Sequence, residues 1–388
     1  MCGKLTKDTV QVNCDNEAAE KGSYPHFMLK EIFEQPRALR DTINPRINEE
    51  EKKICLGEVK ITAEQLKNTD RVFMAACGTA YHAGLIGKYT IEKLAGIPVE
   101  AILASEFRYN APMLTKKSLL IVVSQSGETA DTLGALRLAK EKGARVLAVT
   151  NVVDSSVAHE ADDVIFTWAG PEISVASTKA YVTQLAAMYL IAGHFAELLG
   201  TVSKKEIADL VIALKNIPDQ VAKFLEQKER IEQIEQLAVS LAANENCFYI
   251  GRGMDHPVAM EGSLKLKETS YIHAEAYAAG ELKHGPMALI REGMPVIGVV
   301  TQDHVHEKTI SIVEEVVARG AQTIVVTYEG DDRVAKTAGG TIFIPRTAPL
   351  VAPILAVIPL QLLAYYTAVH RGCDVDKPRN LVKAVTVE

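Results

Sequence analysis

Short apolar runs alternate with longer amphipathic stretches over most of the chain. The runs in the first half are Val72–Ala76, Val99–Ala104, Leu119–Val123, Val146–Thr150 and Val164–Thr167. The runs in the second half are Cys247–Gly251, His273–Tyr277, Pro295–Val300, Thr323–Thr327 and Thr341–Ile344. Such runs are typical of buried strands, and the stretches between them are typical of helices. The alternation therefore predicts an α/β fold with parallel sheets that carry helices on both faces.

Long helical patterns lie between and after these runs. Two of them, 174–200 and 204–243, separate the two series. The stretch 349–370 is apolar enough to imitate a membrane span, but its internal prolines favour a buried helix with a proline-rich entry. Residues up to Arg46 are polar and irregular apart from one predicted helix around 26–33 that ends near Pro36, and we interpret them as an arm or linker.

The two halves resemble each other, which indicates an internal repeat. The segment ACGTAYHAG at 76–84 corresponds to IGRGMDHP at 250–257, and LLIVVSQSGETADT from Leu119 corresponds to PVIGVVTQDHVHEKT from Pro295. A repeat of this size predicts two copies of one open α/β domain. The predicted arm, first domain, second domain and tail are residues 1–45, 46–203, 204–375 and 376–388.

Composition places the chain among soluble globular proteins. Of 388 residues, 48% are hydrophobic and 23% are charged, and 42 Lys and Arg against 49 Asp and Glu leave a net charge of −7. This mild acidity gives no electrostatic reason to bind nucleic acid or an anionic membrane. The six cysteines form no CxxC pair and the start has no apolar signal-peptide core, so we expect a cytoplasmic location.

The turn after the third apolar run has the chemistry of a phosphate site. In open α/β sheets, ligands bind beyond the carboxyl ends of the strands. The segment SQSGET, residues 124–129, leads straight into a predicted helix, where free N–H groups favour an anion. Gly127 allows a close backbone approach, and hydroxyl groups come from Ser124, Ser126 and Thr129. Neutral donors without a lysine predict the monophosphate of a small molecule, whereas an ordinary serine-capped turn is the alternative.

The corresponding turn in the second half differs in charge. It reads TQDHVHE at 301–307, and Asp303 stands where Ser126 stands in the first half. A carboxylate at that place would repel phosphate, so we predict one phosphate site per chain, in the first half. The acidic residues and histidines of this second turn suggest a metal site, but we favour a polar surface loop and expect no metal.

Three charged residues of the second half share one predicted helix face. Glu261, Lys265 and Glu268 fall at positions i, i+4 and i+7. One interpretation is a surface ion-pair ladder. The other places Glu268 at a cleft as a proton shuttle whose pKa is raised by partial burial. Lys265 would oppose that rise and hold a developing oxyanion.

Two further candidates lie in a loop and in the tail. His284 is part of GELKHGP, a shaped loop directly after a predicted strand, and histidine suits the opening of a hemiacetal ring at neutral pH. An inert loop histidine is the alternative. The tail has a hydrophobic alternation around Lys383, so docking is an alternative to fraying. A docked lysine acts through a Schiff base or through its charge.

Together these segments resemble the isomerase part of the glucosamine-6-phosphate synthase family, the glutamine:fructose-6-phosphate amidotransferases. The resemblance extends from His26 to Glu388 and includes HFMLKEIFEQP, ACGTAYHAG, SQSGETADT, SVASTKAYVTQL, KLKETSYIHAEAYAAGELKHGP and DVDKPRNLVKAVTVE. The segment SQSGET alone would indicate only the wider sugar isomerase (SIS) family. The resemblance implies a flavodoxin-like fold for each half, a homodimer with active sites near the subunit interface, fructose 6-phosphate as substrate and no cofactor.

The resemblance also implies residue roles. Its phosphosugar contacts fall on Thr79, Ser124, Gln125, Ser126, Thr129, Val175 and Ser177. Its isomerase base falls on Glu268, and its ring-opening histidine falls on His284, supplied by the neighbouring subunit. Lys265 matches a supporting lysine, and Lys383 matches the tail lysine at the sugar carbonyl. The family has a serine where this chain has Ala80, so one contact to a sugar hydroxyl is in question.

The largest departure from the family is at the start of the chain. The family begins with a glutaminase domain whose N-terminal cysteine attacks glutamine. Met1-Cys2-Gly3 has the look of that start, but the next residues do not continue the pattern. The residues before Arg46 are too few for a glutamine pocket, and a cysteine alone has no oxyanion hole. We therefore expect no glutamine hydrolysis, with either an excised isomerase part or a protein that uses free ammonia as the interpretation.

Three functions fit this sequence. The leading hypothesis is a ketose–aldose isomerase that converts fructose 6-phosphate, with ammonia, to glucosamine 6-phosphate. The enzymatic alternative is a glutaminase-free glucosamine-6-phosphate deaminase. The third is a non-catalytic module that senses phosphosugars, which would have no need of Glu268, His284 and Lys383.

Overall fold

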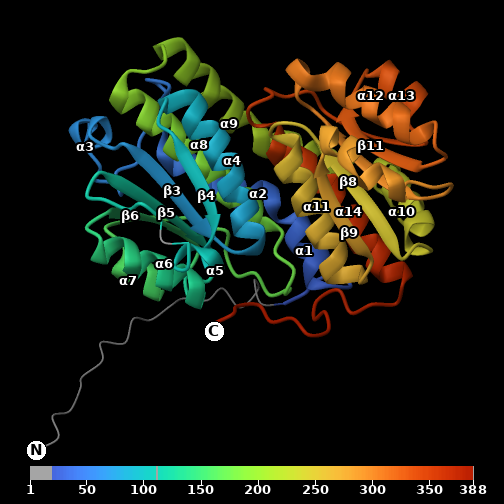
Figure 1. Ribbon diagram of the computed structural model, residues 1–388, viewed down its shortest axis with the longest axis horizontal. Coiled ribbons are helices and arrows are strands. Elements are labelled where there is room, and N and C mark those ends of the chain that lie inside the picture. The colour runs from blue at the N-terminus through green and yellow to red at the C-terminus, as the bar shows by residue number, and fades with distance from the viewer. Residues whose placement is uncertain (1–19, 111, 388) are drawn as a thin grey trace, which may run out of the picture.

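Two α/β lobes lie side by side, each built on a five-stranded sheet (Figure 1). The structure, a computed structural model, describes residues 20–110 and 112–387. The expectations for Met1-Cys2-Gly3 concern positions outside the described residues. Within them, one hydrophobic cluster extends through both lobes, and each lobe has a further cluster of its own.

Both sheets are parallel and have the same strand order. The first comprises β3 (Arg71–Ala76), β4 (Val99–Leu103), β5 (Ser118–Ser124), β6 (Arg145–Thr150) and β7 (Asp163–Phe166). The second comprises β8 (Asn246–Gly251), β9 (His273–Ala278), β10 (Pro295–Val300), β11 (Gln322–Tyr328) and β12 (Gly340–Ile344). Their orders are β4-β3-β5-β6-β7 and β9-β8-β10-β11-β12. This is the flavodoxin-like order 2-1-3-4-5, which confirms the predicted fold of each half.

Helices cover both faces of each sheet. Those in the first half are α3 (Ala63–Lys67), α4 (Gly78–Ala95), α5 (Ala104–Phe107), α6 (Ala130–Glu141), α7 (Ser156–Glu160) and α8 (Lys179–Leu199). Those that follow are α9 (Lys204–Leu225), α10 (Lys228–Ala242), α11 (Asp255–Ser270), α12 (His306–Val317), α13 (Asp332–Thr337) and α14 (Ala352–His370). Every apolar run that predicts a strand forms one. The central strands β5 and β10 are buried along their whole length because helices cover both of their faces.

Two helices, α8 and α14, are long and apolar enough to cross a membrane. In their most apolar windows, 78% and 89% of the residues are buried inside the protein, as in core helices. Pro353 lies in the first turn of α14, where a proline is tolerated, and Pro359 lies inside the helix. The stretch 349–370 therefore has the proline-rich entry and the burial that its sequence predicts.

The structure corrects four predictions about local structure. The segment before Arg46 is more than an arm with one helix, since α1 (Phe27–Phe33) is followed by α2 (Gln35–Ile43). Pro36 suggests the end of a helix, but it lies in the first turn of α2. The long pattern 204–243 is two helices, and the pattern 174–200 becomes helical only from Lys179.

The C-terminal tail crosses from the second lobe to the first. After α14 it runs along one side of the molecule, drawn in red in Figure 1. The Asp376 carboxylate accepts hydrogen bonds from the N–H groups of Phe27, at 3.0 Å, and Met28, at 2.9 Å, which caps α1. Further on, the N–H of Ala130 donates to the Val385 carbonyl at 3.1 Å. The tail is docked on both lobes, and it reaches the start of α6.

Close packing of α11 on α14 predicts a sharp difference between two helical glycines. A Cβ atom at Gly262 would lie 2.7 Å from Cδ1 of Leu360 and 2.9 Å from the ring of Tyr249. We expect Gly262→Ala to lower the free energy of unfolding by about 1–3 kcal/mol, although alanine is the better helix former. Gly84→Ala is the matched control, since its Cβ would meet Met74 only at 3.8 Å. Urea denaturation measures both changes, and equal stabilities would contradict this account of the packing.

Candidate active site

The turn after β5 has the shape of an anion cradle. The hydroxyl groups of Ser124 and Thr129 lie 3.0 Å apart, and the N–H of Gly127 donates to the Ser124 hydroxyl at 3.0 Å. Gly127 has a φ of +67°, and a Cβ there would lie 2.2 Å from Oγ of Ser155. Both the backbone conformation and the close approach require glycine.

The acidic residue of this turn faces away from the cradle. The Glu128 carboxylate accepts hydrogen bonds from the N–H of Ser156, at 2.7 Å, and from its hydroxyl, at 2.8 Å. These bonds place the negative charge at the start of α7. The remaining groups of the turn, hydroxyls and backbone amides, are neutral donors suited to a phosphate monoester.

Thr79 brings a second element to the same edge of the sheet. It lies in the first turn of α4, directly after β3, and β3 is the hydrogen-bonded neighbour of β5. Because α4 and α6 follow neighbouring strands in this order, their N-termini flank the switch point, where ligands bind in such sheets. Ala80, the next residue on α4, is buried.

Helix α11 of the second lobe carries a buried ion network to Thr79. The Lys265 ammonium lies 2.5 Å from Oε2 of Glu268, 3.4 Å from Oε1 of Glu261 and 3.0 Å from Oγ1 of Thr79. The side chains of Lys265 and Glu261 are fully buried, whereas that of Glu268 is 22% exposed. The interpretation of these residues as a surface ladder is therefore wrong.

Electrostatics keep this lysine charged. Burial acts to lower the pKa of Lys265, but the carboxylates of Glu261 and Glu268 outweigh it and raise the pKa above its ordinary value. The buried ammonium holds one oxygen of Glu268 while that residue remains partly open to solvent. Such a carboxylate can accept and return a proton beside a fixed positive charge.

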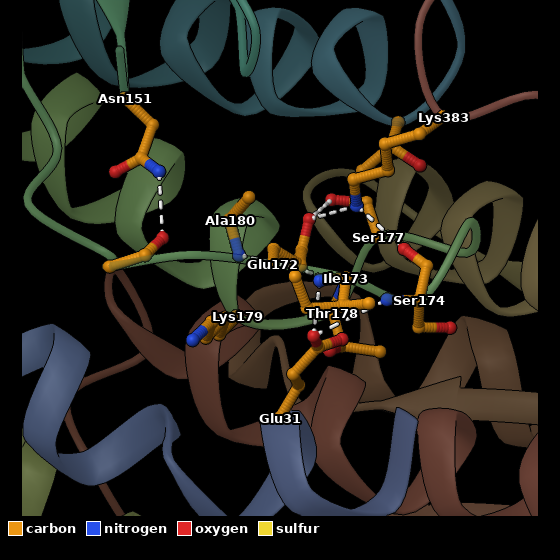
Figure 2. Close-up of polar contacts among 12 residues, drawn as sticks. Glu31, Asn151, Glu172, Ile173, Ser174, Ser177, Thr178, Lys179, Ala180 and Lys383 are labelled. Carbon is orange, nitrogen blue, oxygen red and sulfur yellow. Dashed lines mark hydrogen bonds and ion pairs between the residues drawn. The ribbon is translucent and has the colours of Figure 1, made fainter. Parts of the chain in front are cut away.

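Glu172 anchors the segment before α8 (Figure 2). The sequence patterns do not predict a role for this residue. Its buried carboxylate accepts hydrogen bonds from Ser177 Oγ, at 2.8 Å, and from the N–H groups of Thr178, at 2.9 Å, and Ala180, at 3.0 Å. Lys383 of the tail donates to Glu172 at 2.6 Å and to the Ser174 carbonyl at 2.8 Å. These bonds explain why residues 174–178 form a loop where the pattern predicts helix.

The charges of Glu172 and Lys383 stabilise each other. Burial acts to raise the pKa of Glu172, but the Lys383 ammonium and the two amides outweigh burial and lower the pKa to about 2. The Glu172 charge also raises the pKa of Lys265, so the tail and the α11 network belong to one electrostatic cluster. The tail lysine therefore lies beside the segment that carries Val175 and Ser177.

A second buried carboxyl, that of Glu31, supports the same segment from α1 (Figure 2). Its Oε1 accepts hydrogen bonds from the N–H groups of Ile173, at 2.5 Å, and Ser174, at 3.3 Å. Its Oε2 has no hydrogen-bond partner. Burial raises the pKa of Glu31 to about 8, and the charge of Glu172 adds to the rise.

The predicted residues form separate groups of contacts, and His284 lies apart from them. Lys265 contacts both Thr79 and Glu268. Lys383 contacts Glu172, which also holds Ser177 and whose charge acts on Lys265. The N–H of Val175 donates to the Asp376 carbonyl of the tail at 3.0 Å. The carbonyl of Gln125 accepts from the N–H of Asn151 at 3.1 Å. His284 is exposed at the end of a short 3-10 helix, Ala279–His284, that follows β9.

In the second lobe, an internal carboxylate occupies the turn that corresponds to the cradle. The fully buried Asp255 carboxylate accepts hydrogen bonds from the N–H groups of Thr301, at 2.7 Å, and Gln302, at 3.2 Å. Asp303 is exposed and pairs with Arg346 at 3.0 Å. An internal carboxylate thus occupies amides of this turn, which supports one phosphate site per chain. Among the described residues, no group of three or more His, Cys, Asp and Glu could hold a metal.

Comparisons with known proteins agree with this geometry. The family model described as the SIS domain matches residues 65–193 and 240–371, one segment in each lobe. The chain belongs to the SIS domain family. Glutamine–fructose-6-phosphate aminotransferase (isomerizing) of Clostridium tetani is 55% identical over 385 residues, which are 99% of this chain and 63% of that protein. The chain therefore spans less than two thirds of the length of such curated relatives.

Solved structures of SIS proteins show the same fold. The C-terminal domain of glucosamine-fructose-6-phosphate aminotransferase from Francisella tularensis matches with a TM-score of 0.88 at 40% identity, over 92% of this chain and 100% of that domain. The chain is therefore similar along its length to an isomerase part of these aminotransferases. A glucosamine-6-phosphate deaminase from Thermotoga maritima has a TM-score of 0.71 at 24% identity, which shows the SIS fold alone.

The buried carboxyl of Glu31 predicts a pH dependence of stability. Between an ordinary pKa of 4.5 and its folded pKa of about 8, Glu31 keeps a proton that the unfolded chain has released. Stability from this group is therefore lost as pH rises through that window. We compare the unfolding free energy of Glu31→Gln with that of the parent at each pH. We expect this difference to shift in favour of the variant by about 1 kcal/mol or more between pH 5 and pH 8. Urea denaturation at both pH values tests this, with exposed Glu50→Gln as the control, and an unchanged difference contradicts it.

Proposed function

We propose that this chain is the isomerase module of a glucosamine-6-phosphate synthase, converting fructose 6-phosphate and ammonia to glucosamine 6-phosphate and water. The observation that carries the proposal is the contact between the lobes. The phosphate cradle and Thr79 belong to the first lobe, and Lys265 of the second lobe contacts both Thr79 and Glu268. A sugar phosphate held in the cradle would lie beside a carboxylate suited to proton transfer. The names of the relatives support the same substrate.

The proposed reaction divides into steps that these residues can serve. His284 opens the sugar ring by moving a proton between the hemiketal hydroxyl and the ring oxygen. Ammonia then adds to the C2 carbonyl and water leaves, which forms an imine. Glu268 removes a proton from C1 and returns one to C2, while the proton of the C1 hydroxyl passes to the nitrogen. The imine thereby becomes an amine, and C1 becomes the aldehyde carbon. No electrons are gained or lost overall, and the route therefore needs no redox cofactor.

The two lysines have different proposed tasks. Lys265 is fully buried, so its charge is fixed beside Glu268 and stabilises the negative charge that develops during proton transfer. Lys383 belongs to the tail, is 25% exposed and contacts the segment of Ser177, so it can reach a sugar carbonyl. Glu172 keeps that lysine in place.

The same assays distinguish the proposed function from two related ones, a deaminase and a sensing module. A glucosamine-6-phosphate deaminase would release ammonia from glucosamine 6-phosphate faster than the chain forms this product from fructose 6-phosphate. A sensing module would bind either sugar phosphate without proton exchange at C1. Glutamine is tested beside ammonia, and we expect ammonia to be the amine donor. The proposed location is the cytoplasm, which the free thiols of Cys55, Cys77, Cys247 and Cys373 support.

Replacement of the proposed base should separate catalysis from binding. We expect Glu268→Gln to slow exchange of the C1 proton of fructose 6-phosphate with solvent by at least about 100-fold, because an amide cannot serve as the base. Binding of fructose 6-phosphate, measured by calorimetry, should be unchanged. Lys267→Gln, at an exposed neighbour on α11, is the control with parent activity. Equal loss of binding and exchange, or normal exchange, would refute the assignment of the base.

The position of His284 supports a homodimer in which each subunit completes the active site of the other. Glu268 lies in the last turn of α11, beside the start of β9 at His273. The strand runs parallel to β8 for six residues before the loop of His284, a distance of about 20 Å. His284 is therefore at the opposite edge of its own lobe from Glu268, whereas a neighbouring subunit could present it.

Mixing two inactive variants tests this arrangement. In a dimer of Glu268→Gln with His284→Asn, one of the two sites would contain both native residues if His284 crosses the interface. We expect a mixture allowed to exchange subunits to recover up to about a quarter of parent activity, since about half of the dimers are hybrid. Each variant alone should remain inactive. Failure to recover activity, with subunit exchange verified by mass spectrometry, would place His284 and Glu268 in the same subunit.

A further inference from the structure

A histidine of the first lobe contacts the buried network of the second lobe. His82 lies on α4, three residues after Thr79, and its Nδ1 is 2.7 Å from Oε2 of Glu261. Its side chain is 10% exposed, and that of Glu261 is fully buried. A ring nitrogen that faces a carboxylate oxygen donates its hydrogen to it. None of the reaction steps proposed above uses this contact between α4 and α11, two helices that pack at the centre of the molecule (Figure 1).

Two carboxylates compete for one ammonium in this network. Lys265 lies closer to Glu268, at 2.5 Å, than to Glu261, at 3.4 Å. The two oxygens of Glu261 have separate partners: Oε2 accepts from His82, and Oε1 accepts from the Thr79 hydroxyl at 3.1 Å. Because these donors help to satisfy Glu261, it can remain a buried carboxylate while Lys265 stays nearer to Glu268.

Other titratable groups face the network from the elements packed around it. From α8, the buried hydroxyl of Tyr181 has no hydrogen-bond partner, and burial followed by the charge of Glu261 raises its pKa. From the segment before α8, Glu172 acts on Lys265 through its charge. From α11, His256 faces His82, and burial lowers the pKa of His256, with the His82 charge adding to this effect. Of these groups, His82 is the one with a direct hydrogen bond to Glu261.

We propose that His82 is a positioning residue for the isomerase base: by holding Glu261, it leaves Lys265 on Glu268. This inference rests on the proposed role of Glu268. Without the donor at position 82, Glu261 would draw the ammonium of Lys265 toward itself. Glu268 would then lose the positive charge that favours its ionised form.

The pH profile of the reaction tests the proposal. In His82→Leu, which removes the donor and keeps an apolar volume, the acidic limb of the kcat/KM profile should move up by about one pH unit. At pH 6, kcat should fall while the dissociation constant for fructose 6-phosphate stays at the parent value. In His82→Asn, the amide nitrogen can replace Nδ1, so the limb should return to the parent position. A purely structural role for His82 would lower the thermal unfolding temperature without moving the limb.

A second variant makes the opposite prediction and does not depend on the folding of His82→Leu. Glu261→Gln removes the competing charge, so Lys265 would serve Glu268 alone. The acidic limb should then move to lower pH. Shifts of opposite sign in the His82 and Glu261 variants support the proposal, and no shift or a shift of Glu261→Gln to higher pH overturns it. A parent chain without C1 proton exchange would instead overturn the proposed function, so the two failures are distinguishable.

Discussion

A buried ammonium group, that of Lys265, joins the two lobes at the proposed active site. A charged lysine with no exposed surface is stable only when carboxylates and hydrogen-bond acceptors surround it. Lys265 finds Glu261 and Glu268 on its own helix, but its third partner, Thr79, belongs to the other lobe. Any movement of α4 away from α11 would take one of these three partners from the buried charge. The charge of Lys265 thus helps to hold the proposed base beside α4 of the first lobe.

The two lobes share a strand order, yet only one has an open anion cradle. In the first lobe Glu128 turns its charge toward Ser156, which leaves the turn lined by neutral donors. In the second lobe Asp255 fills the turn with an internal carboxylate. Glu268 lies thirteen residues beyond Asp255 on the same helix, or about 20 Å along it. A phosphate bound at the second turn could not place its sugar at Glu268. A cradle in the second lobe therefore could not serve the proposed reaction.

The sequence predicts the architecture more fully than it predicts the polar contacts. Strands such as β5 and β10 are continuous apolar runs because both faces are buried, and their signal is local. The common face of Glu261, Lys265 and Glu268 also follows from helical spacing. Their burial does not, because it depends on α4 packing against them.

The roles of Glu172 and Glu31 are harder still to predict from the sequence, because each meets partners distant in sequence. The single local sign is that Glu172 follows shortly after a predicted strand. Pro36 misleads because a proline fits both the end and the first turn of a helix.

The docked tail helps to hold the segment before α8 in place. Asp376 caps α1, and the same residue accepts the N–H of Val175 through its carbonyl. Helix α1 in turn presents Glu31 to the amides of Ile173 and Ser174. The segment before α8 is therefore held from both sides, by α1 and by the tail, before Lys383 adds its charge to Glu172. Since α1 lies outside the repeated α/β unit, the resemblance between the two halves could not predict this support, and the site needs elements that neither lobe supplies from its sheet.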